Sequence, residues 1–203
     1  MNINQYLTEA ASKNNIDPKN LQFPDCDIDP NKIKVIMISE VPSKSPEDGF
    51  YSSAENSEYM QSAKGLFEGG GLPIKNMREF LDMGIYITTA VKSPKIVTAV
   101  ERGTIVAQLP ILEAEIALFA NVKVIMLMGD VAIKAFNVIA KSQTKKNVIP
   151  AGSTYKIRGN EYFWGSVRVF PSYIMTGKNL LIEKGKCDMI SDDIRRMRTV
   201  AGL

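Results

Sequence analysis

The chain has 203 residues, of which 45% are hydrophobic and 23% charged, and its formal net charge is +3. This length suits one domain, 1–203, and the composition is that of a globular protein rather than a disordered chain. The absence of histidine excludes Ser-His-Asp and Cys-His catalysis, a histidine general base and histidine-ligated zinc. The two cysteines are too few for a disulfide framework or for an iron–sulfur cluster. We therefore expect a reducing, cytoplasmic environment and no metal or cofactor.

In chain order, residues 4–13 predict a short amphipathic helix, and the polar, proline-marked residues 14–31 predict a linker or an ordered loop. The N-terminus lacks the basic and apolar regions of a secretory signal. No apolar run approaches the ~18 residues needed to span a bilayer, so we expect no membrane partner. The apolar run 33–38 predicts a strand that is buried on both faces. The glycine-rich run 65–71 predicts a flexible loop without chemistry.

The pattern then alternates between helices and strands. Helices are expected at 75–83, at 109–120 with Pro110 in the first turn, at 131–141 with Asp130 as N-cap, and at about 178–200 with a break near Gly185. Further strands are expected at 84–91, 122–128 and 166–170, and a β-hairpin at 155–164 around Gly159-Asn160. This order predicts a three-layer α/β/α sandwich with a mainly parallel sheet of about four strands, preceded by the extension 1–31.

Ligands of open α/β sheets bind at the carboxyl ends of the strands. The first strand ends at Ser39-Glu40-Val41-Pro42-Ser43, followed by Glu47-Asp48-Gly49-Phe50-Tyr51. The Glu40 carboxylate can stabilise a developing cation or position a water, and Phe50 and Tyr51 can stack on a base. The same residues also fit a polar loop with a solvated acid.

The second strand ends at Thr88-Thr89, followed by Lys92, and these residues fit either a phosphate-binding end or an ordinary strand with surface lysines. Gly129-Asp130 after the third strand fits a helix cap better than an anion site. The fourth strand leads to Ile174-Met175-Thr176-Gly177-Lys178, which fits a phosphate grip or a normal strand-to-helix turn. No glycine-rich nucleotide fingerprint is present.

Taken together, these strand ends resemble the uracil-DNA glycosylase superfamily, and its thermophilic iron–sulfur type most closely. The family motif Gly-Glu-Ala-Pro-Gly is matched by Ser39-Glu40-Val41-Pro42-Ser43, and Tyr-Ile-Thr-Asn-x-Val-Lys-Cys by the segment from Tyr86 to Ser93. Met128-Gly129-Asp130-Val131-Ala132 matches a later turn, and Ile174-Met175-Thr176 stands where the family has His-Pro-Ser. The resemblance runs from about residue 34 to the C-terminus. The cluster cysteines and the late histidine are absent, and Thr89 replaces the asparagine that reads uracil.

The resemblance implies a DNA-binding protein that acts in base-excision repair, and we expect a monomer. It makes Glu40 the catalytic residue, Phe50, Tyr51 and Thr89 the base-binding residues, and Lys92, Thr176, Gly177 and Lys178 the DNA contacts. Two alternatives stay open: a catalytically silent nucleic-acid-binding module on the same fold, and a small-ligand or nucleotide-handling α/β protein unconnected with repair. Salt-dependent DNA affinity would distinguish the repair enzyme and the silent module from the small-ligand protein. Formation of abasic sites would distinguish the repair enzyme from the silent module.

Overall fold

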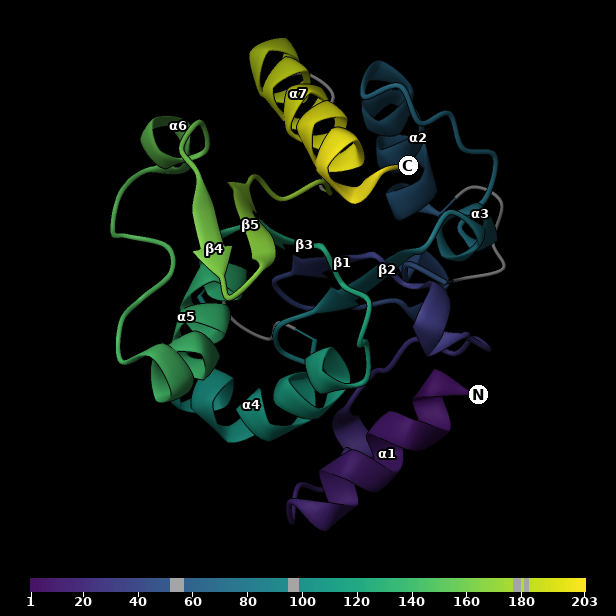
Figure 1. The fold of residues 1–203 in the computed structure, drawn as a ribbon. Helices are drawn as coiled ribbons and strands as arrows, with labels where there is room; N and C mark the ends of the chain where they lie inside the picture. The colour runs from purple at the N-terminus through teal and green to yellow at the C-terminus, as the bar shows by residue number, and fades with distance from the viewer. Residues whose placement is uncertain (52–56, 95–98, 177–179, 181–182) are drawn as a thin grey trace.

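The computed structural model describes residues 1–51, 57–94, 99–176, 180 and 183–203. Five strands form one sheet in the order β2-β1-β3-β5-β4 (Figure 1). Their bounds are β1 Val35–Ser39, β2 Ile85–Thr89, β3 Val124–Met128, β4 Tyr162–Trp164 and β5 Val167–Ser172. Four strands run parallel, and β4 pairs antiparallel with β5 at the edge. The expected α/β fold with a mainly parallel sheet is confirmed, with β4 as a fifth strand.

The inner strands are buried on both faces, which is why they read as unbroken apolar runs. Val35 of β1 pairs with Ile85 of β2 on one side and with Val124 of β3 on the other. Alternate side chains enter different clusters: Ile36 and Ile38 face one layer of helices, and Val35 and Met37 face the other.

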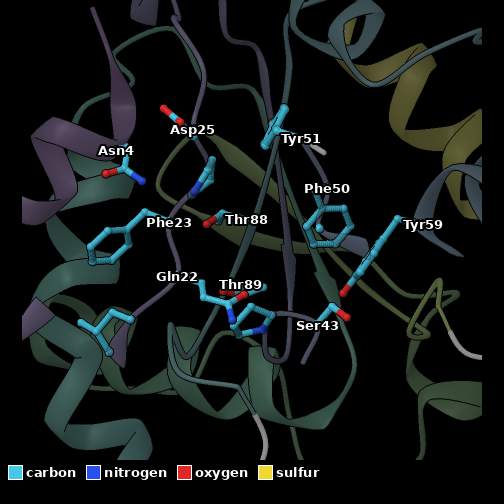
Figure 2. A pocket seen from close by; sticks show the side chains of 14 residues that line it. Asn4, Gln22, Phe23, Asp25, Ser43, Phe50, Tyr51, Tyr59, Thr88 and Thr89 are labelled. Carbon is cyan, nitrogen blue, oxygen red and sulfur yellow. The ribbon is translucent and has the colours of Figure 1, made fainter. Parts of the chain in front are cut away.

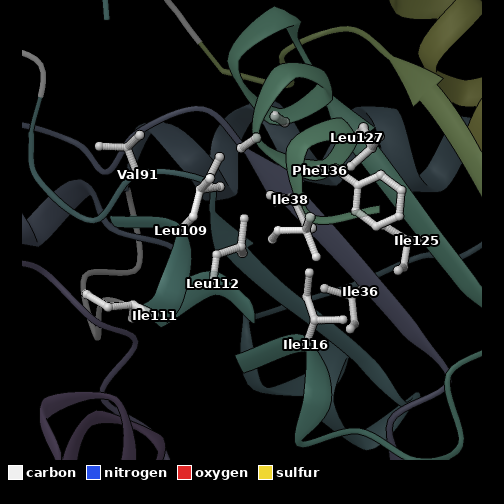
Figure 3. Close-up of a cluster of buried hydrophobic side chains, with 14 of the residues drawn as sticks. Ile36, Ile38, Val91, Leu109, Ile111, Leu112, Ile116, Ile125, Leu127 and Phe136 are labelled. Atoms are coloured by element: carbon white, nitrogen blue, oxygen red, sulfur yellow. The ribbon is translucent and has the colours of Figure 1, made fainter. Parts of the chain in front are cut away.

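Three helices lie on the face of Ile36 and Ile38. They are α1 (Ile3–Lys13), α4 (Arg102–Ala117) and α5 (Asp130–Thr144). Figure 3 shows side chains of α4 and α5 packed against those of β1 and β3. Helix α1 packs on α4, and the Tyr6 hydroxyl donates to the Ala114 carbonyl at 3.2 Å. Because α4 is covered by the sheet and also by α1, it is apolar on most of its circumference.

The opposite layer contains α2 (Glu58–Gly69), α3 (Arg78–Asp82) and α7 (Lys184–Ala201). The prediction of a flexible loop over 65–71 is wrong, because α2 continues to Gly69 and buries Leu66 and Phe67. The glycines allow α2 and α7 to pack closely where the two helices cross. A Cβ at Gly69 would lie 2.6 Å from the Ser191 Oγ of α7, and one at Gly70 would lie 2.4 Å from the Ile194 Cγ2.

The helix expected from residue 109 begins at Arg102, so Pro110 lies within α4 rather than in its first turn. The helix expected over about 178–200 is described from Lys184 onward as α7, and it begins directly after the non-helical Glu183, next to the expected break near Gly185. The hairpin is displaced: residues 154–157 form the short helix α6 (Thr154–Ile157), and the turn lies at Gly165-Ser166 between β4 and β5. Gly165 has a φ of +59°, which suits such a turn. The short 3-10 helices are η1 (Pro18–Asn20), η2 (Pro30–Lys32) and η3 (Pro46–Asp48).

None of the described helices combines the length and apolarity that crossing a membrane would require.

Candidate functional site

The strand order creates a crevice at the carboxyl edge of the sheet. After β1 the chain moves to β2 on one side, whereas β3 leads to β5 on the other side. Ligands of such sheets bind where neighbouring strands separate in this way. Glu40 follows β1 and Gly129 follows β3, so both residues lie at this switch point.

Helix α5 holds the Glu40 carboxylate. Its Oε1 accepts a hydrogen bond from the Val131 amide at 3.1 Å, in the first turn of α5. The helix N-terminus carries partial positive charge, which complements an acidic side chain placed there. The expectation that Asp130 caps this helix is wrong, because Asp130 makes no capping bond and Glu40 supplies the acceptor. Gly129 has a φ of +101°, and a Cβ there would lie 2.6 Å from Oε1.

A pocket of about 270 Å³ lies beside this point (Figure 2). Phe50, Tyr51 and Tyr59 lie on one side of it in Figure 2, the segment with Phe23 and Asp25 lies on the other, and Thr88 and Thr89 lie between. Its size is near the lower end of ligand pockets, roughly 300 Å³. Aromatic rings with a few polar groups are typical of a site for a flat, polar ligand.

The aromatic rings are held by neighbours. The ring of Phe50 packs against that of Tyr59, with centroids 3.9 Å apart and planes tilted by 57°. The Tyr51 hydroxyl accepts a hydrogen bond from the Ile87 amide at 2.9 Å, and its ring stacks at 6.2 Å on that of Tyr86. Burial raises the pKa of Tyr51, so the phenol is neutral.

Lys92 does not reach the surface. Its ammonium is fully buried, pairs with Glu115 of α4, and donates to the Thr88 Oγ1 at 2.8 Å and the Thr89 carbonyl at 2.7 Å. Glu115 also accepts from the hydroxyls of Tyr86 and Thr88. The expectation that Lys92 contacts DNA phosphates is therefore wrong. The lysine instead ties the end of β2 to α4.

The loop after β5 lies over Glu40. A second hollow, of about 440 Å³, is lined by Glu40, Gly129, Ile174 and Thr176, among others. A Cβ at Gly129 would lie 2.7 Å from Ile174 Cγ1, so the isoleucine is next to the carboxylate. The Ser172 hydroxyl of β5 donates to Asp193 of α7 at 2.7 Å, which fixes the start of the loop. Gly177 and Lys178 lie outside the described residues.

The structure divides the expected site into two hollows at one edge of the sheet. Phe50, Tyr51 and Thr89 line the first, and Glu40 and Thr176 line the second. The chain between them joins the two, since Pro42 and Ser43 line the aromatic pocket directly after Glu40. Among the described residues, no cluster of acidic, cysteine or histidine side chains could hold a metal ion.

Sequence reasoning missed two walls of the aromatic pocket. Tyr59 comes from α2, a helix whose glycines suggested a loop, and residues 21–25 come from the segment interpreted as a linker or an ordered loop. Phe23 was the available signal, because an aromatic residue in a polar stretch indicates packing. The backbone amide of Gln22 donates to the backbone carbonyl of Lys92 at 2.7 Å, which attaches this wall to the chain that follows β2.

Comparison with known protein families finds no match, and neither does a search of curated proteins. Among solved structures, the chain is similar to wild-type UNG, a uracil-DNA glycosylase, from Nitratifractor salsuginis. The TM-score is 0.48 and the sequence identity 12%, over 95% of this chain and 86% of that chain. Similarity at this level does not establish a function, so the functional conclusion depends on the residues of the site.

Proposed function

We propose that this protein binds DNA and hydrolyses the N-glycosidic bond of a deaminated or damaged base, as a divergent uracil-DNA glycosylase-like enzyme of base-excision repair. The observation that carries the proposal is the Glu40 carboxylate, held by the first turn of α5 at the switch point. The aromatic pocket begins two residues further along the chain, at Pro42. The motif resemblance supports the same assignment.

In this proposal the target nucleotide leaves the duplex, at a cost of a few kcal/mol. Its base enters the pocket and stacks on Phe50, while the sugar passes residues 40–43 toward the second hollow. As the N-glycosidic bond breaks, positive charge develops on the sugar. The nearby Glu40 carboxylate stabilises that charge or orients the attacking water. Thr176, which lines the second hollow, would contact a backbone phosphate.

Base recognition differs from that of the family which the motifs resemble. Thr89 offers one hydroxyl, whereas an asparagine both donates and accepts through its amide. Ile174 stands where the family has a histidine that donates to the leaving base. One such donor contributes roughly 10²–10³ in rate, so we expect slow excision or a different target base.

A second candidate is a catalytically silent module that binds nucleic acid. Two observations favour it. The Glu40 carboxylate already caps α5, which gives it a structural reason to be present. The apolar Ile174 lies close to Gly129 next to that carboxylate, where catalysis would profit from a polar donor.

The test is an alkali-cleavage assay on oligonucleotides that carry uracil, hypoxanthine or xanthine, as single strands and mismatched duplexes. The decisive variant is Glu40→Gln, whose amide oxygen can still accept from the Val131 amide while the charge is lost. We expect excision to fall by roughly 10²-fold or more. The matched control is Glu68→Gln, at an exposed position of α2 that lines neither hollow.

Excision by Glu40→Gln at the wild-type rate would remove Glu40 from the mechanism. An inactive wild-type protein that still binds these oligonucleotides in a salt-dependent way would support the silent module. An inactive protein without such binding would contradict both candidates.

A further inference from the structure

A groove of about 780 Å³ lies between α4 and α5, and neither of the two hollows of the candidate site shares its lining residues. The described residues that line it include Ile105 and Val106 of α4 and Val138 of α5. Its ligand therefore need not be the one that occupies the carboxyl edge of the sheet.

The floor of the groove is aliphatic. Val106 is 47% exposed and Val138 42% exposed, and they are among the largest exposures of apolar side chains in the described chain. Beside Val106, Ile105 is buried and continues the apolar surface into the core. Covering exposed apolar surface is favourable in proportion to the area removed from water, so this floor favours an apolar occupant.

The rim of the groove is cationic. Arg102 of α4 and Lys134 and Lys141 of α5 line it, and no carboxylate is among the described lining residues. Lys134, Val138 and Lys141 are spaced by four and three residues, so they share one face of α5. Lys134 lies 4.0 Å from Asp130, but both side chains are mostly exposed and such a pair is weak. The rim thus presents positive charge on either side of the valines.

Among possible occupants, this combination fits a protein segment better than a nucleic acid. Single-stranded nucleic acids are gripped by basic residues together with aromatic stacking platforms, and the described lining holds no aromatic ring. Amphipathic helices bind in apolar grooves through aliphatic side chains at i, i+3, i+4 and i+7, and flanking charges select the partner. A cationic rim selects flanking carboxylates.

We propose that the α4–α5 groove is a docking site for an acidic amphipathic helix of a partner protein, whose aliphatic side chains cover Val106 and Val138 and whose carboxylates meet Arg102, Lys134 and Lys141. This interaction is separate from base excision and does not depend on it. The groove would connect the protein to a partner while the carboxyl edge of the sheet stays free.

The test is fluorescence anisotropy with a labelled peptide of about 18 residues, or about five helical turns, with leucines along one face and glutamates beside them. We expect saturable binding that weakens with added salt. Val138→Asp and the double variant Lys134→Glu/Lys141→Glu should each weaken it by about ten-fold or more. Matched controls are Val200→Asp, at a valine of α7 that is 44% exposed, and Lys64→Glu on the exposed face of α2.

The result that supports the proposal is loss of binding in the groove variants alone, with a peptide carrying lysines in place of the glutamates failing to bind. The proposal is overturned if the acidic peptide does not bind, if the controls weaken it equally, or if the lysine peptide binds as well. Displacement of the peptide by a DNA oligonucleotide would also overturn it, because the groove would then belong to the nucleic-acid surface. Thermal unfolding of each variant shows that it is folded.

Discussion

Replacing Lys92 by methionine tests the buried ion pair that ties β2 to α4. The substitution leaves Glu115 fully buried without its cation, while the hydroxyls of Tyr86 and Thr88 still donate to it. Removing one partner of a buried pair costs about 3–5 kcal/mol, because the remaining charge is uncompensated. In a domain of this size 1 kcal/mol corresponds to roughly 2–4 °C, so we expect the Tm to fall by about 6–20 °C.

The double variant Lys92→Met/Glu115→Gln separates charge from packing. The glutamine removes the uncompensated charge and keeps an oxygen that can accept from Tyr86 and Thr88. We expect the double variant to be more stable than Lys92→Met alone, with a coupling energy of about 2 kcal/mol. The free energy of unfolding is measured by urea denaturation, followed by the fluorescence of the single tryptophan, Trp164.

The reasoning would be refuted by additive effects of the two substitutions, or by a loss below about 1 kcal/mol for Lys92→Met. Either result would mean that water or another group compensates the charge.

Three further predictions concern single residues. Burial, helped by its acidic neighbours, raises the pKa of Cys26 to about 12, so in a Cys187→Ala background iodoacetamide at about pH 8 should modify it about 10³-fold more slowly than a free thiol. Gly129→Ala should lower the free energy of unfolding in urea by about 1–3 kcal/mol, because its φ is +101° and its Cβ would clash, whereas Gly103→Ala has open space and should be neutral or stabilising. Burial also raises the pKa of Asp193 above 3.8, so just above pH 3.8 the folded chain binds more protons than the unfolded chain. The free energy of unfolding therefore falls as the pH rises through that window. Asp193→Asn should remove this slope from urea titrations made at successive pH values above 3.8, and an unchanged slope would assign it to another group.

The strands were predictable because their composition reports burial on both faces. The runs from residue 33 and from residue 122 became β1 and β3, and each boundary shifted by two residues or fewer. The edge of the sheet was harder to predict. The Gly159-Asn160 pair suggested the hairpin turn, but Arg168 donates to the Asn160 carbonyl at 3.1 Å and fixes that pair before β4 begins. The local turn propensity of this pair therefore did not decide where the hairpin turns, because a contact with a residue eight positions later holds the pair outside the turn.

The candidate site shows the same limit. The residues that follow the strands could be placed at one edge, because parallel strands end together. Which of them face solvent could not be deduced. Lys92 resembled a surface lysine until Glu115, from a helix far along the chain, was brought against it. Pairing across such a distance leaves no local pattern, and neither does the packing of α2 glycines on α7.

The aromatic pocket shares a wall with the N-terminal segment, which gives it a folding dependence. Residues 21–25 are fastened to the sheet through the Gln22–Lys92 hydrogen bond, and the preceding helix α1 rests on α4 rather than on a strand. The pocket is therefore complete only when this segment has docked. Docking of this segment makes ligand binding more favourable by a certain free energy. Because the coupling is reciprocal, a bound ligand makes docking of the segment more favourable by the same free energy. Limited proteolysis of residues 14–25 would consequently report occupancy of the pocket, without any need to observe a chemical step.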